Sequence, residues 1–222
     1  MIEKKEYKKT AESTQRRIVL YNSIMIKTTA LLISELPGYV NPKAKIGRMV
    51  DDGLLFPIIR GLYEDNNKTP SHYLAGSIYG PSYISFEFAL SWYGLIPRNN
   101  RTVTCAAYGK RKEKKHETMF GTFTYRDIPK KVFPKELAVY CENGYSFVMA
   151  TPEKAFCDEL YKLPPAANLK ELKTLMFEEI GIGKRKINRL DPHVIYQIAD
   201  LYCCKNLYLL KSFLRKKYGK PD

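Results

Sequence analysis

The stretch that decides the fold of the N-terminal part is TTALLISELPGYVNPKAKIGRMVDDGLLFPIIRGLY, residues 28–63. Thr28 is placed to cap a helix over Thr29–Leu36, because a threonine oxygen can accept a free amide of the first turn. Pro37-Gly38 ends that helix, since proline cannot continue it and glycine accepts positive φ. Asn41-Pro42 then predicts the start of a second helix, with Asn as the cap and Pro at the first helical position.

A short hairpin follows this helix pair. Gly53 ends the second helix, Leu54–Ile59 is an extended apolar run, and Arg60-Gly61 is a tight turn before Leu62-Tyr63. Upstream, residues 5–22 have the periodicity of a helix, and Ile24-Met25-Ile26 can pair as a strand. Three helices and a two-stranded wing predict a winged helix-turn-helix over residues 1–65.

The helix that starts at Asn41-Pro42 has one apolar and one basic side. Ile46, Met49 and Val50 recur at i, i+3 and i+4 and predict the buried face. The opposite face then carries basic and small residues, which is the chemistry that the major groove of DNA admits. The DNA-binding residues predicted from this arrangement are Thr28, Thr29, Lys43, Lys45, Gly47, Arg48 and Arg60.

These residues are expected to play different parts. Gly47 permits close approach of the backbone to DNA, and Thr28 and Thr29 offer hydroxyls and free amides to a phosphate. Arg60, at the tip of the wing, reaches the minor groove or its flanking phosphates. The alternative is a protein-docking module whose lysines are only solvated.

A polar linker over residues 65–70 separates a second domain, residues 71–222. Its patterns predict a small sheet followed by a helical tail, so the fold class is α+β: a winged helix-turn-helix and then a mixed α/β domain. The predicted strands are 101–108, 118–125 and 145–149. The predicted helices are 82–93, one starting at Thr151-Pro152, 169–180, 192–204 and 205–218.

A basic run lies between two predicted strands of the second domain. It is formed by Lys110, Arg111, Lys112, Lys114 and Lys115. One interpretation is a second contact with nucleic acid or with an acidic partner. The other is a solvated hairpin tip, which is common for basic loops.

Composition favours an anionic partner and argues against a membrane protein. The 222 residues include 37 Lys and Arg against 23 Asp and Glu, a formal net charge of +14. The apolar stretches are far shorter than the roughly 20 residues of a bilayer span. The five cysteines have neither disulfide nor zinc-site spacing, and we expect buried free thiols in a cytoplasmic protein.

The sequence predicts no catalytic residues, metal site or cofactor. The three histidines are far apart, and no Ser/His/Asp set or phosphate-binding glycine loop is present. An enzyme-class alternative is a metal-dependent nuclease built on Glu87, Glu153 and Lys154. Against it, Glu153 falls in the first turn of a predicted helix, where a carboxylate is favoured by the helix dipole.

Several blocks of the chain resemble AbiEi-type antitoxins of the abortive-infection AbiE system, a type IV toxin–antitoxin family. The resemblance covers roughly residues 24–180, and residues 181–222 match no motif. The blocks are Thr28–Leu36, Pro37-Gly38-Tyr39, Asn41-Pro42, Met49–Leu55, Arg60–Tyr63, Pro81–Pro97, Phe120–Phe123, Tyr125-Arg126, Ile128-Pro129 and Ala150–Ala155.

The resemblance implies a bacterial, cytoplasmic regulator with two roles. Its winged helix would repress the protein's own operon by binding an inverted repeat in double-stranded DNA. Its C-terminal antitoxin domain would counteract a nucleotidyltransferase toxin without forming a stable complex. The protein is then expected to be a monomer or weak dimer that pairs on DNA. A regulator with no toxin partner, whose second domain senses a ligand or oligomerises, is the alternative.

Overall fold

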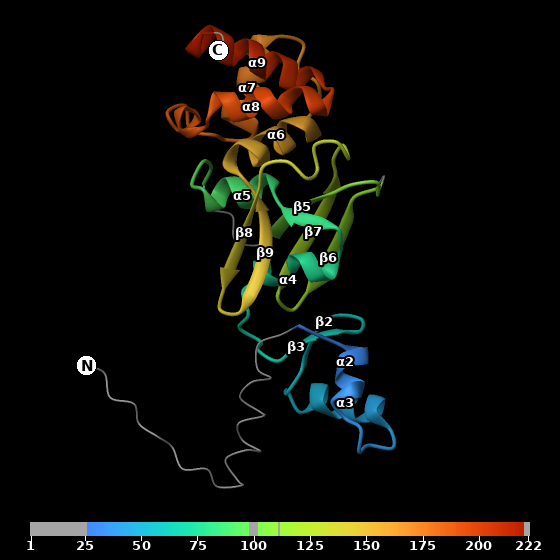
Figure 1. Ribbon diagram of the computed structural model, residues 1–222. Helices are drawn as coiled ribbons and strands as arrows, with labels where there is room; N and C mark the ends of the chain where they lie inside the picture. The colour runs from blue at the N-terminus through green and yellow to red at the C-terminus, as the bar shows by residue number, and fades with distance from the viewer. Residues whose placement is uncertain (1–25, 98–101, 111, 220–222) are drawn as a thin grey trace, which may run out of the picture. The chain divides into compact units, whose positions relative to one another are not determined.

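The structure, a computed structural model, describes residues 26–97, 102–110 and 112–219 (Figure 1). The chain divides into two compact units. The N-terminal unit comprises residues 1–67 and 142–145, and the C-terminal unit comprises residues 68–141 and 146–222. The predicted helix over 5–22 and the first two residues of the predicted strand at 24–26 lie outside the described residues.

The described part of the N-terminal unit contains two helices and a small antiparallel sheet. In chain order these are β1 (Lys27–Thr28), α2 (Thr29–Ser34), α3 (Pro42–Asp51), β2 (Phe56–Ile59) and β3 (Leu62–Glu64). The strands lie in the order β1-β3-β2, so β3 pairs with both of the others. The predicted hairpin with its turn at Arg60-Gly61 is confirmed, and α2 is two residues shorter than predicted.

Both predicted helix caps are confirmed. The Thr28 hydroxyl accepts the Leu31 amide at 3.2 Å, and Asn41 Oδ1 accepts the Ala44 amide at 3.1 Å. The hydrophobic core of this unit is formed by Leu32, Ile46 and Leu55. Partly buried apolar side chains surround it: Ile33, Leu36, Met49, Val50 and Tyr63. The inward face predicted for α3 is therefore confirmed.

The C-terminal unit is built on a mixed six-stranded sheet. Its strands are β4 (Ser82–Ile84), β5 (Thr102–Ala107), β6 (Lys114–Thr118), β7 (Gly121–Asp127), β8 (Leu137–Glu142) and β9 (Tyr145–Ala150). Their order is β6-β7-β5-β4-β9-β8. The pairs β5–β7 and β4–β9 are parallel, whereas β4–β5 and β6–β7 are antiparallel. Strands and helices thus occur in both units, and the predicted α+β class is confirmed.

Helices cover the sheet and form the C-terminal end of the unit. The helices α4 (Ser71–Ile78), α5 (Phe86–Trp92) and α6 (Pro152–Lys162) are followed by α7 (Leu169–Thr174), α8 (Pro192–Ala199) and α9 (Lys205–Tyr218). Figure 1 shows α6, α7, α8 and α9 grouped beyond one end of the strands. The predicted helix 169–180 continues beyond Thr174 as a π-helical turn, and the predicted helix 192–204 ends in a 3₁₀ turn at Tyr202.

Two element predictions in the C-terminal unit are wrong. Residues 82–93 are not one helix, because Ser82–Ile84 pairs with β5 and β9 and the chain turns sharply at Phe86, which has φ +56°. Residues 118–125 are not one strand, since Thr118 and Gly121 are the last pair of the β6–β7 hairpin. The element predictions also missed α4, β8 and a 3₁₀ turn over Lys186–Arg189.

The expectation of buried thiols holds for only part of the cysteines. Cys105 and Cys157 are buried, and burial raises the pKa of both thiols. Cys141 and Cys203 are exposed, and Cys204 is intermediate. Among residues 26–97, 102–110 and 112–219, no helix combines the length and apolar character of a membrane span.

Candidate functional sites

The outer face of α3 is the first candidate site. Lys43, Gly47 and Arg48 are exposed and Lys45 is half-buried, whereas Ile46 on the inner face is only 3% exposed. Lys45 Nζ lies 5.7 Å from the centre of the Tyr39 ring, in the turn before the helix. The basic residues fall in the first seven positions of the helix, and its acidic residues, Asp51 and Asp52, stand at its end. Lys43 and Lys45 thus lie in the first half of α3, and Arg48 lies in its last turn.

Gly47 has no role in the packing of the described residues. A Cβ atom built on it meets no heavy atom within 4 Å, so the fold does not require glycine there for lack of space. Glycine inside a helix is less stable than alanine by roughly 0.5–1 kcal/mol. A glycine that the fold does not require, on the exposed face, permits close approach of another molecule to the backbone.

The two threonines at the start of α2 make more hydrogen bonds within the protein than predicted. The Thr29 amide donates to the Gly61 carbonyl at 2.9 Å, and the Leu31 amide donates to Thr28. Thr29 Oγ1 also lies 3.4 Å from the Gly61 carbonyl oxygen. The expectation of free amides at this site is wrong for the Thr29 and Leu31 amides, because the first bonds to the hairpin and the second to the Thr28 cap. The exposed Thr28 hydroxyl still has a proton to donate.

Arg60 is exposed in the turn between β2 and β3, as predicted for the tip of the hairpin. Its neighbour Gly61 has φ +83°, a conformation that glycine adopts without strain. Lys27, by contrast, is held by the protein itself, since Nζ forms an ion pair with Glu35 at 2.8 Å.

The basic run 110–115 is not a hairpin tip. Lys114 and Lys115 are exposed on β6, at one edge of the sheet, and Lys115 pairs with Glu117 at 2.6 Å. Lys110 packs its Nζ 5.0 Å from the centre of the Tyr79 ring, while Lys112 is exposed. Arg111 lies outside the described residues. The run therefore begins in a loop and continues into an edge strand, and its side chains have different contacts.

A buried ionic network lies between the sheet and the C-terminal helices. Lys154 and Asp158, one turn apart on α6, form an ion pair at 2.7 Å, and both side chains are 0% exposed. The Tyr202 hydroxyl lies 2.9 Å from Lys154 Nζ and donates to Asp158 Oδ1 at 2.6 Å. Tyr83 and Ser85 donate their hydroxyls to Asp158 Oδ2 at 2.9 and 2.7 Å. This carboxylate is satisfied by four side chains from three parts of the chain.

Burial shifts the pKa values of the side chains in this network. Burial lowers the pKa of Lys154, and the nearby Asp158 opposes that shift. Burial and the Asp158 charge together raise the pKa of Tyr83 and Tyr202. The network has no exposed member through which a substrate can be reached, so its role within the described chain is to hold α6 against β4 and the tail.

The residues considered for a nuclease do not converge. Lys154 is buried in the network, and Glu153 accepts the Asp191 amide at 2.9 Å. Glu87 instead pairs with Arg126 Nη2 at 2.7 Å. No group of three His, Cys, Asp or Glu side chains in the described ranges is arranged to hold a metal ion.

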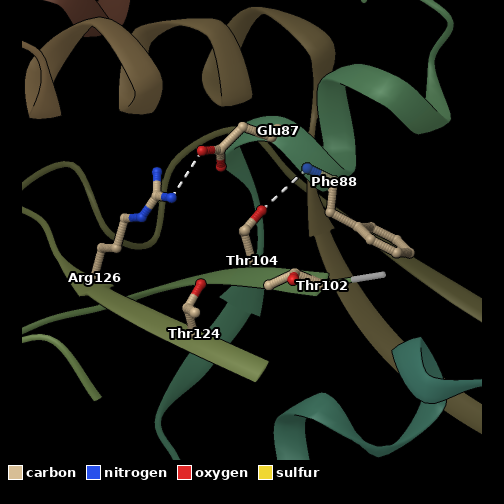
Figure 2. A pocket seen from close by; sticks show the side chains of 6 residues that line it. All are labelled: Glu87, Phe88, Thr102, Thr104, Thr124 and Arg126. Atoms are coloured by element: carbon tan, nitrogen blue, oxygen red, sulfur yellow. Dashed lines mark hydrogen bonds and ion pairs between the residues drawn. The ribbon is translucent and has the colours of Figure 1, made fainter. Parts of the chain in front are cut away.

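Glu87 and Arg126 belong to a second candidate site, a polar pocket of about 180 Å³ beneath α5 (Figure 2). It is lined by Glu87, Phe88, Thr102, Thr104, Thr124 and Arg126. The strand register explains this set. In the parallel pair β5–β7, Thr104 lies opposite Thr124 and Ala106 opposite Arg126, so alternate residues of both strands face the same side. The polar residues of the two strands therefore lie beneath Glu87.

Arg126 is the charged centre of this pocket. Besides Glu87 it faces Glu159 of α6, with Nη1 3.5 Å from Oε2, and Glu113, with Nε 3.9 Å from Oε1. Its guanidinium lies 5.0 Å from the centre of the Phe86 ring. Burial, and then the charge of Glu87, raise the pKa of Glu159 to about 8, so this carboxyl carries a proton at neutral pH.

Sequence reasoning did not single out Arg126, Asp158, Glu159 or the threonines of this pocket. A signal was present in residues 122–126, where Thr122, Thr124 and Arg126 alternate with the buried Phe123 and Tyr125. That alternation predicts a polar face of a strand, but it does not predict which helix covers it.

Comparison with known proteins adds information on the fold. No family model matches the chain, and no curated protein matches it. A solved structure, the Rv2827c protein from Mycobacterium tuberculosis, matches with a TM-score of 0.51 and 12% sequence identity. The match covers 90% of this chain and 80% of that one. At this identity the likeness shows a shared α+β fold and carries no activity from one chain to the other.

Proposed function

We propose that the N-terminal unit is a winged helix-turn-helix that binds duplex DNA, and that the protein represses transcription of its own operon. One observation carries the proposal: α3 turns Ile46 into the core and presents Lys43, Gly47 and Arg48 to solvent. The first residues of a recognition helix are those that contact base edges in the major groove. Lys43 lies in that part of α3, and Gly47 and Arg48 continue the exposed surface toward the end of the helix.

The surrounding elements support the same function. Arg60 at the tip of the β2–β3 hairpin suits contact with the minor groove or its phosphates, and Thr28 suits donation of its hydroxyl to a phosphate. One such unit reads one half-site. We therefore propose that two copies of a monomer or weak dimer pair on an inverted repeat.

A gel-shift assay on the DNA upstream of the protein's own reading frame tests this function across a salt series. If about six to eight phosphates are neutralised, affinity falls by roughly a thousandfold or more between about 50 and 200 mM salt. Unlabelled upstream DNA should compete far better than DNA of scrambled sequence. Equal competition by both would contradict a sequence-specific repressor.

We propose as a second role that the C-terminal unit counteracts a nucleotidyltransferase toxin, as the AbiEi resemblance implies. The supporting observation is that the resembling blocks contact one another. Glu87, from the block 81–97, pairs with Arg126, from the block Tyr125-Arg126, and Lys154, from the block 150–155, lies 5.3 Å from the centre of the Tyr83 ring. The blocks thus belong to one structural assembly rather than to separate surfaces.

Expression of the full chain together with a nucleotidyltransferase encoded beside it tests the second role. Growth arrested by the toxin should be restored, while the two proteins should not co-elute in gel filtration. A variant with Lys43, Lys45 and Arg48 replaced by alanine should restore growth as well as the native chain, although it no longer represses. Arrest that persists with the native chain would contradict the antitoxin role.

Two alternatives predict different outcomes. A cytoplasmic regulator without a toxin partner predicts that no nucleotidyltransferase reading frame adjoins its own. A metal-dependent nuclease predicts cleavage of DNA or RNA with Mg²⁺ that is lost in Glu153→Ala. The contacts of Lys154 and Glu153 within the protein favour the DNA-binding regulator over the nuclease.

A further inference from the structure

The strand β6 lies at one edge of the sheet in the C-terminal unit. It stands first in the strand order β6-β7-β5-β4-β9-β8, so among the described strands only β7 pairs with it. Three of its five residues, Lys114, Lys115 and Glu117, are exposed. The edge of a sheet presents backbone N–H and C=O groups that can pair with a strand of another chain. The side of β6 that faces away from β7 is therefore a candidate interaction surface.

The register of the β6–β7 hairpin shows which backbone groups point away from β7. Thr118 pairs with Gly121 at the tight turn, a position at which the N–H and C=O groups face the partner strand. These groups alternate in direction along an antiparallel strand, so those of His116 also face β7. The backbone groups of Lys115 and Glu117 then face away from β7 and are the ones that another strand would meet.

We propose that two copies of the chain associate through β6, antiparallel and about a two-fold axis at His116. In this register Lys115 of one copy lies opposite Glu117 of the other, and Lys114 lies opposite Thr118. Lys115 and Glu117 are also the residues with outward backbone groups. Each such pair can therefore exchange both backbone hydrogen bonds and form an ion pair across the interface. Two-fold symmetry repeats the pair on the other side of the axis.

Charge favours this register over its neighbours. A displacement by two residues sets Lys115 opposite itself in one direction and Glu117 opposite itself in the other, and like charges directly opposite each other are destabilising. Within one copy the two side chains lie 2.6 Å apart, but they are 59% and 71% exposed, so water screens this pair and leaves both open to a further partner. The other edge strand, β8, has one charged residue, Glu142, and lacks this complementarity.

The association is expected to be weak. Each copy contributes the five residues of β6, whereas stable interfaces contain roughly 20–30 residues a side. Lysines on an edge strand commonly prevent pairing with unrelated strands, and here Glu117 leaves one favourable alignment, with a second copy. Self-association itself does not depend on DNA binding. Its use in pairing two copies on an inverted repeat rests on the proposed function.

Sedimentation equilibrium of the full chain, at concentrations up to the millimolar range, tests the proposal by charge reversal. Lys115→Glu and Glu117→Lys should each weaken self-association by about tenfold or more, because each sets like charges opposite each other twice in the interface. The double reversal should restore the native constant to within about threefold, since it restores both opposite-charge pairs. The two single reversals change the net charge in opposite directions, so net charge cannot explain a loss in both.

A matched control changes the same charge elsewhere. Lys184 is exposed in a turn of the C-terminal unit, and Lys184→Glu lowers the net charge as much as Lys115→Glu does. This variant should associate at least as well as the native chain, because the net charge of +14 opposes association. A loss in Lys184→Glu equal to that in Lys115→Glu would contradict pairing through β6.

Cysteine cross-linking tests the position of the axis independently. In a chain whose exposed Cys141 and Cys203 are replaced by serine, His116→Cys should form disulfide-linked dimers with a mild oxidant such as diamide. Residues opposite each other in a non-hydrogen-bonded pair have Cα atoms about 4.5 Å apart, which a disulfide can span. Lys115→Cys should cross-link far less, because its own equivalent lies diagonally across the pair, at about 7–8 Å.

The outcomes separate this interface from the proposed function. A native chain that stays monomeric at millimolar concentration, association that neither charge reversal changes, or equal cross-linking by His116→Cys and Lys115→Cys would overturn the proposal. If the chain fails to bind its upstream DNA but associates as expected, the repressor function fails and the interface through β6 stands.

Discussion

Replacing Lys154 by methionine is expected to lower the free energy of unfolding of the C-terminal unit by about 3–5 kcal/mol. The substitution removes the cation from a pair in which neither side chain is exposed, and leaves Asp158 buried with only hydroxyl donors. Three hydroxyls donate hydrogen bonds to the carboxylate but do not neutralise it. Urea unfolding followed by fluorescence measures the effect, because the chain's single tryptophan, Trp92, lies in this unit.

The control for this variant is an exposed ion pair. Lys211 pairs with Asp200 at 2.6 Å, but the two side chains are 22% and 58% exposed. Lys211→Met should therefore cost less than about 1 kcal/mol. Similar losses for Lys211→Met and Lys154→Met would show that burial of the Lys154–Asp158 pair does not determine the stability of this unit.

Combined replacement of Lys43, Lys45 and Arg48 by alanine is expected to weaken binding to the upstream DNA by about a hundredfold or more. A base contact by arginine contributes roughly 1–3 kcal/mol, and each phosphate contact that is lost reduces the salt slope by about 1. All three substitutions are on the outer half of α3, so the core around Ile46 should be unaffected. Gel shifts at several salt concentrations, with circular dichroism of the variant, measure both quantities.

The matched control removes the same charge elsewhere. Lys170, Arg215 and Lys216 are exposed on helices of the C-terminal unit, and their replacement by alanine also lowers the net charge by three. This variant should bind DNA within a few-fold of the native chain. Gly47→Gln adds bulk to α3 without charge and should weaken binding, because a side chain there occupies the space open to the groove. Equal losses from the two triple variants would attribute DNA binding to net charge alone.

The N-terminal helices were predictable because their ends are local signals. Thr28 and Asn41 each bond to an amide three residues ahead, an interaction that depends on nothing distant in the chain. The burial of Ile46 likewise follows from its spacing within one helix. Most of the candidate DNA surface could be predicted for this reason, but the use of the Thr29 amide by Gly61 could not, since it depends on how the hairpin packs.

The elements of the C-terminal sheet were harder to predict. Ile84 fits a helical apolar stripe with Phe88, Ala89 and Trp92, yet it lies in a strand because β5 and β9 flank it. Those partners are distant in sequence, and no local pattern contains them. The pocket has the same origin: Glu87, Thr104 and Arg126 come from three elements, and only the pairing of β5 with β7 brings the last two to one face.

The tail beyond residue 180 has a consequence for how the protein can be shortened. Tyr202 bonds to both members of the Lys154–Asp158 pair, and the Asn206 side chain bonds to the carbonyls of Leu160, Leu163 and Pro164 at the end of α6. Truncation at residue 180 removes both residues and opens an ionised pair to water from one side. A fragment limited to the region that resembles the antitoxins would therefore lack its own support, and a failure of that fragment to act would report on its folding rather than on its activity.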